Sequence, residues 1–378
     1  MVQVCDEVVA RFSELRWHVA WALGTKGRKL SELGRREEAV RACDELVARF
    51  GTAPEVELRK RAGWALINKG DTLGKLGRND EAVKTYNEIV ALYGSAPEAE
   101  LRVLVAVAVV SKGNTLNKIS RQEEAVNAYD EVLDYIGTAT EVELCVQVAW
   151  AWIFKGGALG LIGRGEEAVK AYDEVVVRFG TATEVKLREL VAGALVNKGN
   201  MLDKLGGGEE AVNVYVEVVA RFGTATEVEL RELVAGALVN KGNTLGKLGR
   251  GEEALKAYDE IVTRFGTATE VELRRQVAKA LVAKGNTLVT LGKREEGVKV
   301  YDEVVDRFGD AADTLPMFHL SVAGAMMGKA LVLEIQDCKD DARNILTEII
   351  GKFEHVETDE VKQIVERARK TLQELDSQ

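Results

Sequence analysis

Ala194-Leu195-Val196-Asn197-Lys198-Gly199-Asn200 is a stretch that returns 43 residues later as Ala237-Leu238-Val239-Asn240-Lys241-Gly242-Asn243. Looser copies keep its lysine–glycine pair, and all seven such pairs are spaced by 43 residues. A fixed period of this size is typical of stacked supersecondary units, because each unit alone is too small to bury its apolar face. The sequence therefore predicts an array of repeats. The pairs are Lys26-Gly27, Lys69-Gly70, Lys112-Gly113, Lys155-Gly156, Lys198-Gly199, Lys241-Gly242 and Lys284-Gly285.

The composition indicates a folded, mainly helical chain. Hydrophobic residues make up 46% and charged residues 30% of the 378 residues, which is ordinary for a folded protein. Only three prolines occur, which favours helix. The net charge of −10 disfavours binding along a phosphate backbone, so we expect no nucleic-acid partner.

Neither a secretory signal nor a membrane span is predicted. The stretch Met1–Glu7 lacks the basic region of a signal peptide, and the longest apolar run, Val103–Val110, is too short to cross a bilayer. The four cysteines show no metal-ligand spacing and are interpreted as reduced core thiols. Together these features favour a cytoplasmic setting without a membrane partner.

One repeat, beginning at Thr226, illustrates the expected hairpin. Thr226 and Glu229 have the spacing of a capping box. Apolar residues at three-four spacing then predict a helix as far as Leu248. Gly249 ends this helix, because glycine adopts the left-handed cap conformation without steric cost. A shorter second helix follows, so each repeat is a helix of about 22 residues and one of about 14.

Gly242, Leu245, Gly249, Ala254 and Tyr258 have the identity and spacing of the tetratricopeptide repeat signature. The chain therefore resembles that family, which implies an all-α, right-handed superhelical solenoid of antiparallel helix hairpins. The repeat exceeds the family's usual ~34 residues and mostly lacks its loop proline, departures that resemble the longer repeats of kinesin light chains. The same signature stands at Gly70, Leu73, Gly77, Ala82, Tyr86 and at Gly199, Leu202, Gly206, Ala211, Tyr215.

The two ends of the chain depart from the repeat. The N-terminal residues copy a second helix whose first helix is absent, and five loop residues of the later repeats are missing after it. We therefore predict one uninterrupted helix from about residue 3 to about residue 32. Its unpaired face would drive self-association or mark a piece of a longer array. The predicted divisions are an orphan second helix at 1–12, seven repeats at 13–312, a degenerate eighth repeat at 313–351 and a capping helix at 352–378.

We expect no catalysis, no metal site and no cofactor. The three histidines, His18, His319 and His355, form no metal-ligand pair, and the sequence contains no phosphate-binding loop or nucleophile elbow. Gly207-Gly208 is interpreted as a helix–helix turn, since no strand precedes it.

The repeated lysine is unusual because it lies within the apolar stripe of each first helix. A charge directed towards the interior usually needs a partner, and the second helices carry equally regular glutamates such as Glu88 and Glu131. Two interpretations remain open. The lysines either pair with Glu or Asp of the same or an adjacent repeat, or extend their ammonium groups into water.

The resemblance places ligands on the concave face that the first helices line. Asn and Lys residues four apart lie on one side of a helix there. They would form a stripe of donors for a peptide backbone, acidic side chains or a C-terminal carboxylate. The alternative is that asparagine caps backbone and lysine is solvated. The resemblance to the carboxylate-clamp subfamily is partial, because other basic positions of that clamp are not basic here. The candidates are Asp71 with Lys75, Asn114 with Lys118, Asn200 with Lys204, Asn243 with Lys247, and Asn286.

Trp21, Trp64 and Trp150 occupy equivalent places and are the aromatic candidates for the same face. Two later repeats hold glycine there, which predicts an aromatic end and an open, shallow end of the groove. Aromatic side chains dominate binding energy at interfaces, while core packing is the alternative for these tryptophans. Trp17 and Trp152 are expected to pack between helices.

The leading functional interpretation is a protein-interaction scaffold that holds a peptide or protein partner in the concave groove. One alternative is a structural or self-assembling array, which the unpaired N-terminal helix favours. The other is a sensor segment of a larger regulatory protein.

Overall fold

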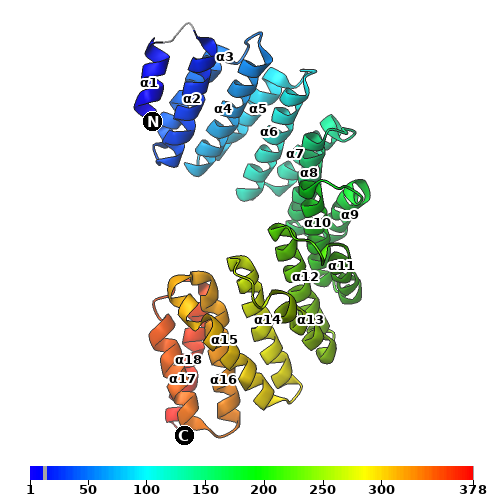
Figure 1. Cartoon of the computed structure of the whole chain (residues 1–378), viewed down its shortest axis with the longest axis vertical. Coiled ribbons are helices and arrows are strands. Elements are labelled where there is room, and N and C mark those ends of the chain that lie inside the picture. Colours follow the sequence, from blue (N-terminus) through cyan, green and yellow to red (C-terminus); the bar gives the residue numbers. More distant parts are fainter. Residues whose placement is uncertain (12–14, 378) are drawn as a thin grey trace. The chain divides into compact units, whose positions relative to one another are not determined.

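The structure, a computed structural model, describes residues 1–11 and 15–377, and all regular elements in these residues are helices (Figure 1). The chain divides into two compact parts, Met1–Ala194 and Leu195–Gln378, and each is described by itself. The helices follow one another as hairpins, which confirms the expected all-α repeat, and the first helix is the longer one except where α15, with 21 residues, follows α14, with 20.

The first part contains one single helix and four complete hairpins. α10 (Val185–Lys204) lies across the boundary between the parts. The elements are α1 (Val2–Arg11), α2 (Arg16–Glu32), α3 (Arg36–Phe50), α4 (Val56–Lys75), α5 (Asn79–Tyr93), α6 (Ala99–Lys118), α7 (Gln122–Ile136), α8 (Val142–Leu161) and α9 (Gly165–Phe179).

The second part completes the hairpin begun by α10 and continues to a terminal helix. The elements are α11 (Gly208–Phe222), α12 (Val228–Lys247), α13 (Gly251–Phe265), α14 (Val271–Thr290), α15 (Arg294–Thr314), the short η1 (Pro316–Phe318), α16 (His319–Ile335), α17 (Lys339–Phe353) and α18 (Asp359–Asp376).

The turn between the two helices of a hairpin depends on the predicted glycine. Gly77 has a φ of 77° and Gly249 a φ of 75°, in the left-handed region that glycine enters freely. Ser120 replaces this glycine after α6 and adopts the same region, with a φ of 61°. The predicted ends of the first helices are therefore confirmed.

The predicted capping boxes are wrong. α12 begins at Val228, and the residue in the N-cap position is Glu227 rather than Thr226. The Glu227 carboxylate accepts a hydrogen bond from the backbone N–H of Thr226 at 3.0 Å. The equivalent Glu98 accepts one from Arg59 of the preceding first helix at 2.8 Å. This glutamate accepts hydrogen bonds from the loop or from the neighbouring repeat. The Thr-x-x-Glu spacing does not reveal these contacts.

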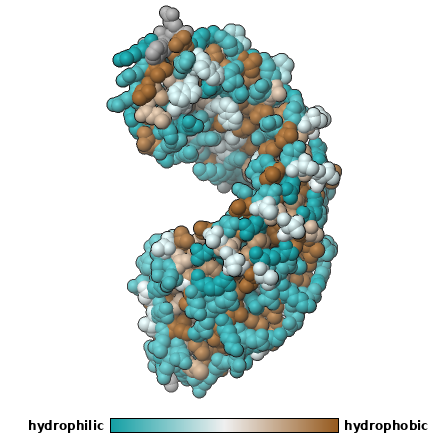
Figure 2. Space-filling model, in the orientation of Figure 1, coloured by the Kyte–Doolittle hydropathy of each residue, from teal (hydrophilic) through white to brown (hydrophobic). Residues whose placement is uncertain are grey.

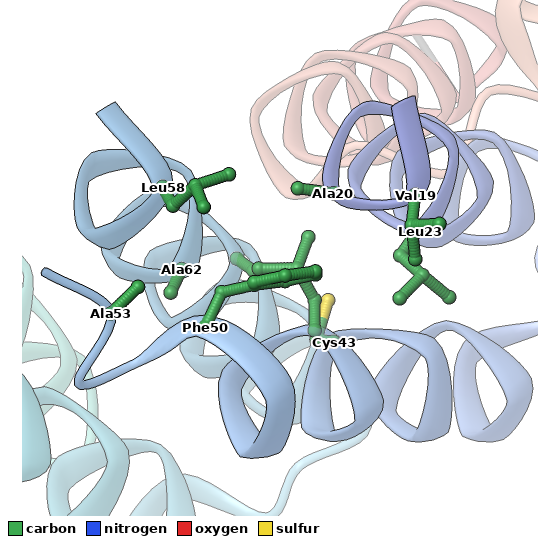
Figure 3. Close-up of a cluster of buried hydrophobic side chains, with 10 residues drawn as sticks. Val19, Ala20, Leu23, Cys43, Phe50, Ala53, Leu58 and Ala62 are labelled. Carbon is green, nitrogen blue, oxygen red and sulfur yellow. The ribbon is translucent and has the colours of Figure 1, made fainter. Parts of the chain in front are cut away.

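Within each part, the first helices form one face of the array. The backbones of adjacent first helices approach one another closely, as those of α2 and α4 do, whereas described second helices meet through side chains, as Lys352 of α17 does with Asp313 of α15. The core lies where each first helix meets its neighbouring second helices. Figure 3 shows this core between α2, α3 and α4, formed by Val19, Ala20, Leu23, Cys43, Phe50, Leu58 and Ala62.

The glycine of each lysine–glycine pair makes room for an aromatic ring. The ring of Tyr86 lies so close to Gly70 that a Cβ added there would be 2.5 Å from it, and a Cβ on Gly242 would be 2.3 Å from Tyr258. Such a distance is too short for any real contact, so a larger residue would push the ring out of the core. The period of 43 residues therefore reflects a packing contact between the two helices of a repeat.

The repeated lysines form ion pairs with an aspartate of the preceding repeat. Lys69 Nζ lies 2.6 Å from Asp44, and Lys155 Nζ lies 2.6 Å from Asp130. The pairing interpretation is therefore confirmed, with aspartate as the usual partner. Both pairs are partly exposed, so each contributes roughly 0.2–1 kcal/mol. The same pairing joins Lys26 with Asp6 and Lys284 with Asp259.

Two lysines depart from this pattern where the aspartate is replaced. Asn87 stands at the aspartate position that Lys112 would use, and Lys112 pairs instead with Glu131 of its own repeat at 2.9 Å. Val216 stands at the position that Lys241 would use. Among the described residues, Lys241 has no ion pair.

The predicted uninterrupted N-terminal helix is wrong. Leu15 has a ψ of 74°, outside the helical region, and α1 and α2 are separate helices. Lys26 pairs with Asp6, 20 positions away, whereas one continuous helix would separate them by about 30 Å. α1 folds back because its apolar face, including the buried Cys5, then packs against α2. Residues 12–14, where the chain passes from α1 to α2, lie outside the described residues.

Apolar composition alone does not set any helix apart as a membrane span. Val142–Leu161 and Pro316–Ile335 are long and apolar enough to cross a bilayer, but 44% and 50% of their most apolar windows are buried against other helices. Figure 2 shows polar residues over most of the visible surface, with apolar residues in separate patches. Three of the cysteines are buried as expected, but Cys338 is exposed, because it is the N-cap residue of α17 in the turn after α16.

Candidate functional site

A groove crosses α2, α4 and α6 on the face of the first helices. It consists of three neighbouring cavities of about 310, 150 and 300 Å³. Arg28 and Asn68 line both the first and the second cavity, and Asp71 and Lys75 line both the second and the third. The three cavities therefore adjoin one another. The groove's tryptophan, charged and amide residues are Trp21, Arg28, Glu32, Arg61, Trp64, Asn68, Asp71, Lys75, Asn79, Asn114 and Lys118.

Two tryptophans line the first cavity, here called the tryptophan cavity. Trp21 is 49% and Trp64 is 42% exposed, so neither is a core residue. Trp17 is also exposed, at 43%, which contradicts the expectation that it packs between helices. Trp17 lies in the first turn of α2, where the guanidinium of Arg61 from α4 covers its ring at 4.1 Å. This cation–π contact fixes the arginine beside the cavity.

The basic groups of the groove have no carboxylate partner. Among the described residues, none of them forms an ion pair, although the chain as a whole is acidic. The Nε atom of Arg61 is buried and lacks any hydrogen-bond partner there. These side chains keep their hydrogen-bonding capacity for a bound molecule. They are Arg28, Arg61, Lys75 and Lys118.

The two carboxylates of the groove are already engaged. Asp71 accepts a hydrogen bond from the hydroxyl of Tyr86 at 2.8 Å, and burial raises the pKa of Tyr86, so this hydroxyl stays protonated. Glu32 pairs with Lys29 at 2.5 Å, and this ammonium group holds the pKa of Glu32 below its ordinary value. The groove therefore presents positive charge.

The asparagines of the predicted stripe are held by tyrosines of their own repeats. The Oδ1 atom of Asn114 accepts a hydrogen bond from the hydroxyl of Tyr129 at 2.7 Å, while its amide nitrogen faces the groove without a partner among the described residues. Half of each amide is thus structural, but its partner is a tyrosine hydroxyl and not the backbone that the alternative interpretation named. The same bond joins Asn200 with Tyr215, Asn243 with Tyr258 and Asn286 with Tyr301.

In the second part, two of the predicted residues are engaged within the fold. Asn200 accepts a second hydrogen bond from Asn240 at 2.8 Å. Lys247 pairs with Asp203 of the preceding first helix at 2.6 Å. Lys204, together with Asn243 and Asn286, is exposed to solvent.

Trp150 does not line the groove cavities. Its ring is partly buried on α8 and stacks on Phe154, with ring centroids 4.9 Å apart and planes inclined by 12°. Trp152 lies between α8 and α9 as expected, with Lys155 and Arg178 5.0 and 5.7 Å from its ring.

Five charged or amide residues of the groove escaped the sequence analysis, namely Arg28, Glu32, Arg61, Asn68 and Asn79. Arg28 occupies the place that later repeats fill with Asp71 or Asn114, and Arg61 and Asn68 also line the tryptophan cavity. A comparison of the repeats place by place would have singled out Arg28, because it replaces an uncharged or acidic residue. No cluster of three or more His, Cys, Asp or Glu residues suited to a metal occurs in the described residues.

Comparisons with known proteins agree with this architecture. A family model described as tetratricopeptide repeat matches residues 65–95. The crystal structure of apo RapI is similar with a TM-score of 0.56 at 11% identity, covering 94% of this chain and 99% of RapI. The apo quorum sensor NprR from B. thuringiensis is similar with a TM-score of 0.51 at 13% identity, covering 93% of this chain and 97% of NprR.

A further solved structure, BtubC (BKLC) from P. vanneervenii, is similar with a TM-score of 0.51 at 15% identity, covering 63% of this chain and 92% of BtubC. The search of curated proteins found no match. Identities this low establish the fold alone. The family model matches one stretch of the chain, and the signature residues and the similar helical structures agree with an array of such repeats.

Proposed function

We propose that this chain is a non-catalytic scaffold that binds a peptide or a protein segment in the groove across α2, α4 and α6. The observation that carries the proposal is the tryptophan cavity, where Trp21 and Trp64 expose nearly half of their surface beside Arg28 and Arg61. Large exposed aromatic rings next to unpaired guanidinium groups are the residues that most often dominate binding energy at interfaces.

Each part of the groove supplies a different contact. Trp21 and Trp64 offer flat apolar surface to a large side chain of the partner. The guanidinium groups of Arg28 and Arg61 would pair with a carboxylate, and Lys75 and the amide of Asn114 would bind further acidic or carbonyl oxygens. A segment with both apolar and acidic side chains therefore fits the groove best.

Two further candidate functions follow from specific observations. The similarity to the quorum sensor NprR extends over most of both chains, and a sensor segment would use the same groove for its ligand. Self-assembly has less support, since α1 packs against α2. The exposed Val4 on α1 is the feature that would drive it.

The experiment is a selection of peptides from a random library on the immobilised full chain. We expect enriched peptides that bind the wild type and lose binding to a Trp21→Ala, Trp64→Ala double variant. A Val177→Ala variant, which alters an exposed apolar residue of the second helix α9, is the matched control and should bind normally. No enrichment, or equal binding to the double variant, would refute the proposal.

A further inference from the structure

α8 differs from the other first helices of the first part on the face that continues the groove. Phe154, Gly157 and Leu161 stand at three places where α4 and α6 carry polar side chains. α8 contacts α6, so its face adjoins the end of the groove at Lys118. The polar residues replaced are Asn68 and Ser111 at the first place, Asp71 and Asn114 at the second, and Lys75 and Lys118 at the third.

The apolar face of α8 is rigid and partly open. Trp150 stacks on Phe154, and Phe154 packs against Tyr129 of the preceding hairpin with ring centroids 6.1 Å apart. Leu161 is 67% exposed. No other atom lies within 4 Å of the position where a Cβ on Gly157 would stand. A depression at Gly157 thus separates the stacked rings from Leu161.

The hydroxyl of Tyr172, which has no partner among the described residues, lies beside this depression. The ring of Tyr172 is 4% exposed and covers Gly156, as the equivalent tyrosines cover their glycines. Those equivalents donate to an Asn or Asp one residue further on, where α8 has Gly157. No hydrogen bond joins the Tyr172 hydroxyl to any of the described residues. This hydroxyl is therefore available to donate a hydrogen bond to a bound group.

We infer that α8 is an anchor site for an apolar side chain of the segment bound in the groove. The side chain would lie in the depression at Gly157, between Phe154 and Leu161, and a backbone carbonyl beside it would accept the hydrogen bond of Tyr172. This inference rests on the proposed function. Neighbouring first helices lie about 10 Å apart, and an extended chain spans about 3.3 Å per residue. The anchor residue therefore follows the residue bound at α6 by about three positions.

Two synthetic peptides test the anchor. Both carry a glutamate-rich segment, which is followed in one by a leucine–phenylalanine pair and in the other by two serines. Binding of each labelled peptide is measured by fluorescence anisotropy on the full chain. We expect the apolar peptide to bind about tenfold or more tightly than the serine peptide.

The decisive variant is Gly157→Asn, which gives α8 the asparagine of the other repeats. It should restore the tyrosine–asparagine hydrogen bond and leave the urea midpoint unchanged or higher, while abolishing the preference for the apolar peptide. Leu161→Lys should also remove the preference. Val177→Lys, an equal change on the second helix α9, should keep it.

The possible outcomes separate the anchor from the groove itself. Equal binding of both peptides to wild type and Gly157→Asn overturns the anchor and leaves the groove proposal intact. Absence of binding by both peptides, with no enrichment from the random library, overturns both. Recruitment of the wild type, but not of Leu161→Lys, to phosphatidylglycerol vesicles would assign the apolar face to a lipid surface and overturn the peptide anchor.

Discussion

The first-helix faces of the two parts have the same backbone pattern but different unused side chains. In residues 1–194, Trp21 and Trp64 are exposed around a cavity, and Arg28 has no ion-pair partner among the described residues. In residues 195–378, Gly236 and Lys279 stand at the tryptophan place. The second part therefore lacks a tryptophan ring at this place and also lacks the apolar surface that a partner would cover.

The two faces also differ in the ion pairing of their lysines. Lys75 is unpaired in the first part, whereas its equivalent Lys247 is bound by Asp203 in the second. The amide oxygen of Asn114 accepts one hydrogen bond and that of Asn200 accepts two, and neither amide nitrogen donates to any of the described residues. The comparison shows how a repeat preserves its fold with one set of positions and varies recognition with another.

The largest expected effect is on binding at the first face. The Trp21→Ala, Trp64→Ala variant should weaken library-selected peptides by about 2 kcal/mol or more, roughly a 30-fold loss. Its urea midpoint should stay close to that of the wild type, since both rings are exposed. Isothermal titration calorimetry measures the loss. The matched variant of the second face, Asn243→Ala with Lys247→Ala, should bind normally, and a loss as large as that of the tryptophan variant would erase the difference between the faces.

The next largest effect concerns the contact between glycine and tyrosine that both parts share. Gly70→Ala and Gly242→Ala should each destabilise the chain by about 1–3 kcal/mol, because the added Cβ would overlap a tyrosine ring in both parts. Urea unfolding measures the change. The control is Gly236→Ala, which has open space around its Cβ and should be neutral or stabilising. Tolerance of alanine at Gly70 alone would mean that the two parts are packed differently.

A smaller effect separates paired from unpaired lysines. Lys155→Met removes the ion pair with Asp130 and should cost roughly 0.2–1 kcal/mol, less at high salt. Lys241→Met should be neutral or stabilising, because Val216 offers its ammonium group no partner. Thermal unfolding at low and high salt compares the two. Equal losses of stability in the two variants would show that the Asp130 carboxylate contributes nothing to stability.

The smallest effect is at the turn before α11. Gly207 occupies the N-cap place where Arg78 and Arg250 donate to a glutamate three residues on, and its backbone angles match theirs. Gly207→Arg should pair with Glu210 and raise the urea midpoint slightly at neutral pH. A Gly207→Gln control should not show this pairing gain.

The pH dependence of this gain has a definite sign. The hydrogen bond from Arg78 holds the pKa of Glu81 below its ordinary 4.5. A carboxyl group with a lowered pKa in the folded state stabilises the fold above 4.5 and ceases to do so as the pH falls through the lowered value. The midpoint gain of Gly207→Arg should therefore vanish in acid, and a gain that persists there would exclude the ion pair as its cause.

The fold was predictable because the same structural residues recur in successive repeats. The spacing of the lysine–glycine pairs and the turn glycines predicts the hairpins, and Ser120 holds the place of the turn glycine after α6. The N-terminal helix was mispredicted because a shortened loop was taken for a continuous helix. Sequence periodicity cannot distinguish these when the apolar spacing runs through the break.

The groove was only partly predictable because it depends on deviations from the repeat. The sequence shows Trp21 and Trp64 as aromatic replacements. Arg28 was missed because it departs from the regular stripe of asparagine and lysine. That stripe proved partly structural, since the tyrosine 15 residues further on takes the asparagine oxygen. Exposure and pairing depend on neighbouring helices, which the pattern of a single helix does not contain.

Photo-crosslinking of a library-selected peptide to the full chain tests the central claim most directly. The cross-linked residues are identified by mass spectrometry. The account predicts cross-links on the first helices α2, α4, α6 and α8, within residues 16–161. Cross-links concentrated on α12 and α14, or on the second helices of either part, would contradict it.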